Sequence, residues 1–120
     1  MSDERNPGLE VRTTRFALEI IKLCAELPRS MPAEVLGRQM LRSGTSVGAQ
    51  YREAKRAKSV ADFVSKIEGA LQEEETSYWL ELLTSSSMLT KKRTAPLASE
   101  AEELTAMLAA SAITAKRRRQ

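Results

Sequence analysis

The spacing of the apolar residues constrains the fold of this chain more than any other feature of its sequence. In four stretches, apolar side chains recur at intervals of three and four residues, which places them on one face of an α-helix. The first such stripe consists of Phe16, Ile20, Leu23, Cys24 and Leu27. Abundant alanine, leucine, glutamate and arginine, with few β-branched runs, also favour helices. With 120 residues, the chain is long enough for one domain with a hydrophobic core.

Proline and capping signals give the limits of the four predicted helices. The first covers residues 11–27 and ends at Pro28, and the second runs from about Pro32 to residue 57 or 58. Ser59 and Asp62 form an S-x-x-D capping signature, so the third helix starts there and continues to about residue 86. The segment "LTKKRTAP" reads as a basic loop, after which a fourth helix starts around Pro96.

The later helices also carry apolar stripes. The stripe of the third predicted helix consists of Val60, Phe63, Val64, Ile67, Leu71, Tyr78 and Leu82. The stripe of the fourth consists of Leu97, Ala101, Leu104, Leu108 and Ala112. Short connections between four such helices predict an all-α, up-down-up-down antiparallel four-helix bundle over residues 11–115. Residues 1–10 are predicted to be disordered, and residues 116–120 to form a basic C-terminal tail.

Some functional classes are disfavoured by composition. The sequence has no histidine, so the commonest general base and metal ligand is missing, and no cofactor or metal site is expected. The single cysteine, Cys24, lies on an apolar stripe and is expected to be a packed thiol. No apolar run is long enough to span a membrane and no signal segment is evident, which predicts a cytoplasmic protein without a membrane partner.

Charge is unevenly distributed along the chain. Residues 1–58 and 91–120 each have a balance of +4, whereas residues 59–90 have −5. Either acidic and basic helices pair with each other, or a basic surface attracts a polyanion.

The second predicted helix has three different faces. At about 100° per residue, Arg38, Arg42, Arg52 and Arg56 fall on one line, opposite an apolar core face. A flank between them contains Gly37, Gly44 and Gly48. Each glycine costs a helix about 1 kcal/mol relative to alanine, so close packing of another helix, from the same chain or another subunit, should offset that cost. A helix break at residues 43–48 is the alternative.

Two large apolar residues fall outside the stripe of the third predicted helix. Trp79 and Leu83 lie about 100° or more from its centre. They are interpreted either as packing at the edge of the bundle or as an oligomer contact.

The segments "LRSGTSVGAQYREA" and "YWLELL" show a family resemblance that extends from Arg12 to Leu83. They resemble the small four-helix-bundle proteins encoded in intervening sequences of bacterial 23S rRNA genes. The resemblance implies a ring-shaped homopentamer, generally of unestablished function, and no catalytic residues. It also implies kinship in fold with the accessory protein of diversity-generating retroelements, a basic pentamer that binds nucleic acid and a reverse transcriptase.

Three functions are weighed on these observations. The first is a non-enzymatic oligomer that binds RNA or DNA through Arg38, Arg42, Arg52, Lys55, Arg56 and Lys58, assisted by Lys116–Arg119. The second is a structural oligomer or a scaffold for a protein partner such as a reverse transcriptase. In that case the arginines form salt bridges, between helices or subunits, with Glu53 and Glu73–Glu75. An enzyme is the third and is not expected, because the hydroxyls of Ser43, Thr45 and Ser46 lack a base and a phosphate-loop spacing.

Overall fold

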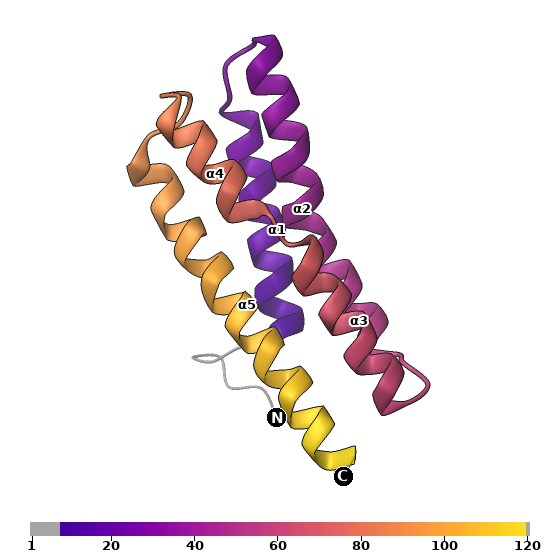
Figure 1. Cartoon of the computed structure of the whole chain (residues 1–120). Helices are drawn as coiled ribbons and strands as arrows, with labels where there is room; N and C mark the ends of the chain where they lie inside the picture. Colours follow the sequence, from indigo (N-terminus) through magenta and orange to yellow (C-terminus); the bar gives the residue numbers. More distant parts are fainter. Residues whose placement is uncertain (1–7, 120) are drawn as a thin grey trace.

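The protein is a bundle of helices around one core. A computed structural model describes residues 8–119, in which the helices are α1 (Leu9–Ala25), α2 (Met31–Lys55), α3 (Val60–Glu73), α4 (Thr76–Ser85) and α5 (Lys91–Arg119). Helices α3 and α4 follow each other along one edge and together take the place of a single helix (Figure 1). The predicted all-α four-helix bundle is therefore confirmed. The disorder predicted for residues 1–10 falls mainly on residues 1–7, which lie outside the described residues; α1 begins at Leu9.

Neighbouring helices run in opposite directions. Helix α1 packs against α2 and α5, while the α3–α4 pair lies against α2 and α5 on the other side of the core. Along each pair of packed helices, contacts with higher residue numbers on one helix have lower residue numbers on the other. Such pairs are Thr13–Gly48 and Leu27–Gly37, Arg12–Glu100 and Glu26–Arg93, Gln50–Glu73 and Ser43–Thr76, and Lys116–Glu68 and Thr84–Thr94.

Serine side chains cap the starts of α2 and α3. Ser30 accepts a hydrogen bond from the amide of Ala33, and Ser59 accepts one from the amide of Asp62 at 3.0 Å. The carboxylate of Asp62 accepts in return from the amide of Lys58. The capping signature predicted at Ser59 and Asp62 is thus confirmed, and its two bonds satisfy amides that the helix itself leaves free.

The third predicted helix is broken, which corrects the expectation of one helix to residue 86. Glu74 has an extended backbone (ψ 106°), and its carboxylate accepts a hydrogen bond from the amide of Thr76 at 2.5 Å. The Thr76 side chain is fully buried, and its hydroxyl lies 2.9 Å from that of Ser43 on α2. Two interactions therefore stabilise the break. The Glu74 carboxylate satisfies the amide that the interrupted helix leaves free, and a buried pair of hydroxyls links α4 to α2.

The break also corrects the predicted face of α4. Leu83, predicted to lie outside the stripe, is fully buried in the core, as is Leu80, whereas Tyr78, predicted to be on the stripe, is 54% exposed. Trp79 is partly buried and packs against the core cluster. Since Glu74 and Glu75 are not helical, α4 starts with a new rotational phase, and counting 100° per residue through the break gives the wrong face.

Helix α5 starts earlier and ends later than predicted. The segment 91–95 belongs to the helix rather than to a loop, and Pro96 lies inside it. Thr90 accepts a hydrogen bond from the amide of Arg93, whose guanidinium pairs with Glu26 at the C-terminal cap of α1. These contacts hold the extra turn although Pro96 cannot donate a helical hydrogen bond. The predicted stripe of α5 is buried, as expected, and residues 116–119 continue the helix instead of forming a separate tail.

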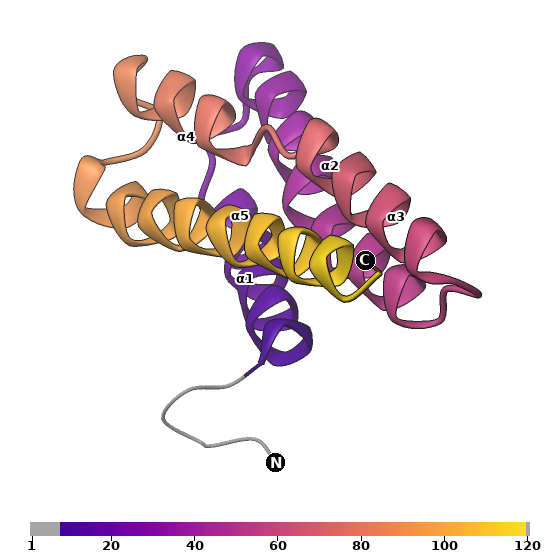
Figure 2. The same cartoon turned by 60° about the horizontal axis from the view of Figure 1, so that its bottom comes forward.

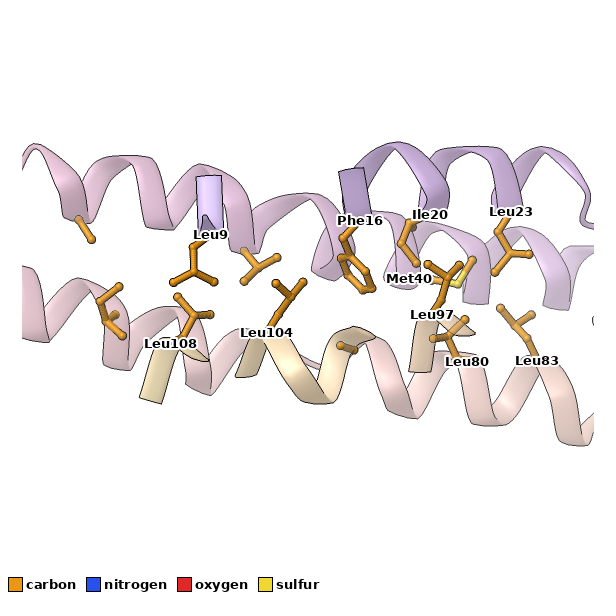
Figure 3. Close-up of a cluster of buried hydrophobic side chains, with 14 of the residues drawn as sticks. Leu9, Phe16, Ile20, Leu23, Met40, Leu80, Leu83, Leu97, Leu104 and Leu108 are labelled. Atoms are coloured by element: carbon orange, nitrogen blue, oxygen red, sulfur yellow. The ribbon is translucent and has the colours of Figure 1, made fainter. Parts of the chain in front are cut away.

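The core lies along the bundle axis, between α1 and α2 on one side and α3, α4 and α5 on the other. Phe16, Ile20 and Leu23 point inward from α1 toward Met40 and the leucines of α4 and α5 (Figure 3). The side chains of Phe16, Ile20, Leu23 and Met40 are at most 2% exposed. The interior is therefore filled by residues of one chain, and no other subunit is needed to cover it.

The glycine flank of α2 faces α1, and α2 is not broken there. A Cβ atom placed on Gly44 would lie 2.9 Å from Cγ1 of Ile20, and one on Gly48 would lie 3.1 Å from the Thr13 hydroxyl. On Gly37 it would lie 2.8 Å from the end of Leu27. Side chains of α1 thus lie so close to the α2 backbone at Gly44 and Gly48 that a larger residue there would force them to shift.

We expect Gly44→Ala to lower the free energy of unfolding by roughly 1–3 kcal/mol, because the new methyl group would overlap the buried Ile20. Gly69→Ala is the matched control: it is also helical, but its added Cβ would meet nothing within 4 Å. That substitution should instead stabilise the protein by up to about 1 kcal/mol. Thermal and urea denaturation measure both, and stabilisation by both substitutions would refute the close contact.

The α3–α4 break predicts a pH dependence of stability. Burial raises the pKa of the Glu74 carboxyl above its ordinary value of 4.5, against the lowering effect of its hydrogen bond from Thr76. A raised folded-state pKa favours folding while the carboxyl is protonated, and this contribution is lost as the pH rises from 4.5 through the raised value.

Glu74→Gln should therefore raise the melting temperature at neutral pH, since the amide oxygen can still accept from Thr76 but cannot ionise. The gain should vanish well below pH 4.5, where the wild-type carboxyl is protonated in both states. Glu102→Gln, on the exposed side of α5, is the control. A gain of the same size at every pH would contradict the assignment to Glu74 ionisation.

Candidate nucleic-acid interface

The line of arginines on α2 faces away from the core. Arg38, Arg42, Arg52 and Arg56 are all exposed, while Met40 and Val47 on the opposite side of the helix are buried. The orientation follows from the α1–α2 packing, because turning the glycines toward α1 leaves the arginine side in solvent. The structure therefore brings the four guanidinium groups onto one accessible surface of the chain.

Part of this charge is neutralised within the chain. Arg38 pairs with Glu34 one turn earlier at 3.3 Å. Glu10 of α1 lies 3.1 Å from Lys55 and 3.6 Å from Arg52. The hydrogen bond and charge of Lys55 hold the pKa of Glu10 below its ordinary value, so Glu10 stays ionised and keeps its partners.

The other cations predicted to bind nucleic acid are not neutralised by a carboxylate of another described residue. Arg42, Arg56 and Lys58 are exposed and form no ion pair with another described residue. Such groups keep their charge available for an external anion, at a cost set mainly by side-chain entropy and salt screening.

The glutamates predicted as salt-bridge partners lie elsewhere. The Glu73 carboxylate accepts from Gln50 at 2.6 Å, and that of Glu74 accepts from the Thr76 amide. Among the described residues, the partners of the α2 arginines are Glu34 and Glu10 rather than Glu53 or Glu73–Glu75. Among the described residues of one chain these predicted salt bridges are therefore not formed, and salt bridges between subunits stay a prediction.

A second group of cations was only partly foreseen. The C-terminal turn of α5 lies at the same end of the bundle as the loop between α2 and α3 (Figures 1 and 2). Arg118 thereby lines the same hollow as Lys55 and Lys58, although at least sixty residues separate it from them in sequence. The antiparallel helix order could have suggested this meeting, because the second and fourth helices of such a bundle end on the same side.

The other residues singled out from the sequence have structural roles. The hydroxyls of Thr45 and Ser46 donate to carbonyls of the preceding turn, and that of Ser43 is used in the Thr76 contact. The Cys24 thiol is half-buried and donates to the carbonyl of Gly37, and burial raises its pKa. A raised pKa disfavours the reactive thiolate.

Two further properties concern residues 8–119 only. No group of three histidine, cysteine, aspartate or glutamate side chains in this range is arranged to hold a metal ion. None of the five helices is both long and apolar enough to cross a membrane.

Comparison with known proteins places the chain in a family. A profile of the 23S rRNA-intervening sequence protein family matches residues 11–110, which include most of α5. The chain belongs to this family. The predicted resemblance is thereby confirmed, and it extends beyond Leu83 into the helix that had been matched only by pattern.

A solved structure of similar fold supports the same assignment. It is a protein of unknown function of the S23 ribosomal protein family, from Bacteroides thetaiotaomicron, 36% identical to this chain. The alignment covers 88% of this chain and 98% of the other, with a TM-score of 0.81. No curated protein matches the sequence.

The surroundings of two arginines predict effects on stability of different size. Arg12 is 17% exposed and forms a two-pronged contact with Glu100, while Arg42 is exposed. We expect Arg12→Gln to lower the free energy of unfolding by roughly 1–3 kcal/mol, because it leaves Glu100 without its charged partner. Arg42→Gln should change it by less than about 0.5 kcal/mol. Urea denaturation of both variants tests this, and equal losses would show that the α2 arginines also stabilise the fold.

Proposed function

We propose that this protein is a non-enzymatic, ring-forming homo-oligomer of the cytoplasm that binds nucleic acid through the basic surface of α2. The observation that carries the proposal is the line of Arg38, Arg42, Arg52 and Arg56 on the solvent side of the bundle, continued by Lys55 and Lys58.

The spacing of the arginines suits a phosphate backbone. Arg38 and Arg56 are eighteen residues apart, which corresponds to about 27 Å along a helix. Several phosphates of a duplex or of folded RNA lie within such a length. Arginine is well matched to them because its planar group contacts phosphate oxygens in pairs and does not lose its charge. Aromatic residues make up only 4% of the chain, so stacking on splayed bases contributes little and backbone recognition dominates.

Assembly has independent support on the surface of α1 and α2. Leu18 and Ile21 of α1 are 53% and 48% exposed, and Val35 and Leu41 of α2 are also exposed. Exposed large apolar side chains on two helices that pack against each other are typical of a protein contact. The pentamer implied by family resemblance would repeat the α2 surface around a ring and increase the total charge presented to one polyanion.

A structural oligomer or a scaffold for a protein partner, such as a reverse transcriptase, is the second candidate. The same exposed apolar side chains favour it, because they suit a protein better than a nucleic acid. In this candidate the α2 arginines pair with carboxylates of another subunit or of the partner. The two candidates therefore differ in what Arg42 and Arg52 contact.

Replacing two of the arginines tests the proposal. Arg42→Glu together with Arg52→Glu should weaken binding to structured RNA and to duplex DNA by at least about tenfold, and should reduce the salt slope of binding by about 2. Lys91→Glu with Lys92→Glu changes the net charge equally at the start of α5 and should have a much smaller effect. Fluorescence anisotropy at two salt concentrations measures binding, and sedimentation velocity measures assembly.

The outcomes separate the candidates. Binding by wild-type protein that is lost only in the α2 variant, with the oligomer intact, supports the nucleic-acid function. An absence of binding even at low salt would rule that function out. Loss of the oligomer in the α2 variant would favour the structural candidate, in which these arginines pair with another protein.

A further inference from the structure

A hollow of about 520 Å³ lies at the end of the bundle where α2 and α5 finish and α3 begins. Its walls come from three segments: the last turn of α2 with the following loop, the first turns of α3, and the last turns of α5. These segments meet at the end of the molecule that carries the C-terminal turn of α5 (Figure 2). The hollow has the volume of a small-molecule site.

The charges that line this hollow are all positive. Lys55, Lys58 and Arg118 contribute cations from two helices and a loop, and no carboxylate lines it. Lys55 forms an ion pair with Glu10, whereas Lys58 and Arg118 have no ion pair with another described residue.

Nearby carboxylates already have partners. Asp62 pairs with Lys66 and accepts from the amide of Lys58, and Glu68 pairs with Lys116. Lys58 and Arg118, with no ion pair to another described residue, therefore leave a net positive potential at the hollow beside the Lys55–Glu10 pair, and this potential favours an anion.

The rest of the lining is apolar or carries hydroxyl groups. Val60 and Phe63 of α3 form an apolar wall, and Phe63 packs against the core. Thr114 of α5 adds a hydroxyl. The start of α3, capped by Ser59, also borders the hollow and adds the positive end of a helix dipole. Cations beside an apolar wall match a ligand in which a charged group and a flat ring are joined, as they are in a nucleotide.

We infer that this hollow binds a phosphate monoester, namely the terminal phosphate of a nucleic-acid strand, with the adjoining base against Val60 and Phe63. A terminal phosphate carries up to two negative charges, whereas an internal phosphodiester carries one, so the two cations Lys58 and Arg118 match the strand end better than an internal position. The inference rests on the proposed nucleic-acid function and assigns it a second contact. The α2 arginines hold the backbone, and the hollow holds the end.

Strands that differ only at their ends test the inference. Single strands of one sequence, with a phosphate at the 5′ end, at the 3′ end or at neither, are compared by fluorescence anisotropy using an internal label. A hydroxyl-ended strand lengthened to the same total charge controls for added charge alone. A phosphate at one of the two ends should strengthen binding about tenfold over this control, as one charge-assisted hydrogen bond does.

The preference should depend on the residues of the hollow. Lys58→Gln with Arg118→Gln should abolish the advantage of the phosphate, so that phosphate-ended and charge-matched strands bind this variant equally. Both should bind it more weakly than the wild type, because Lys58 also belongs to the α2 surface. Lys91→Gln with Lys92→Gln, at the other end of α5, should leave the advantage intact. Both pairs are exposed, and circular dichroism checks that each variant folds.

Equal affinity for phosphate-ended and charge-matched strands would overturn the inference without affecting the proposed function. An advantage that persists in the Lys58 and Arg118 variant would also overturn it. If no strand binds, the proposed function fails, and the hollow is tested alone with a nucleoside monophosphate by NMR. Shifts of Val60 and Phe63 signals that are lost in the variant would then support a monoester site, and unchanged signals would overturn it.

Discussion

The contact between α1 and α2 fixes the rest of the bundle. At Gly44 the α2 backbone lies so close to Ile20 that a Cβ atom would be only 2.9 Å away. Because only the glycine flank of α2 can accept α1 at this distance, the rotation of α2 about its axis is determined. Met40 and Val47 then point into the core, and the arginines, about a quarter of a turn from the glycines, point into solvent. The basic surface is thus a consequence of helix packing.

The break between α3 and α4 solves a packing problem on the opposite side. A continuous helix would turn Tyr78 inward and Leu83 outward. The core would then contain a large ring with a polar hydroxyl in place of an aliphatic side chain. The extended Glu74 resets the phase, so that Leu80 and Leu83 fill the interior. Interrupting the helix frees backbone groups, and the Glu74 carboxylate satisfies the amide of Thr76.

Charged side chains perform two separate tasks in this molecule. Arg12 with Glu100 and Arg93 with Glu26 join α1 to α5 across the surface, where no glycine flank brings the helices together. Arg42, Arg56 and Lys58 form no ion pair with another described residue and are exposed to solvent. Sequence alone does not distinguish the two classes, since every arginine carries the same charge. The distinction arises from which carboxylates the fold brings within reach.

The sequence by itself determined the helical class, the bundle, the buried stripes of α1 and α5, the cap at Ser59 and the family, because each depends on spacing or local chemistry within a short segment. It also determined that Arg38, Arg42, Arg52 and Arg56 share one side of a helix. Tertiary structure decided where α3 ends, where α5 begins and which face of α4 is buried, since partners distant in sequence, such as Ser43 for Thr76 and Glu26 for Arg93, stabilise those local conformations. It also decided that the glycines meet α1 and that Lys55, Lys58 and Arg118 surround one hollow. Helical periodicity gives directions around one axis, and only the packing of several axes shows what lies in each direction.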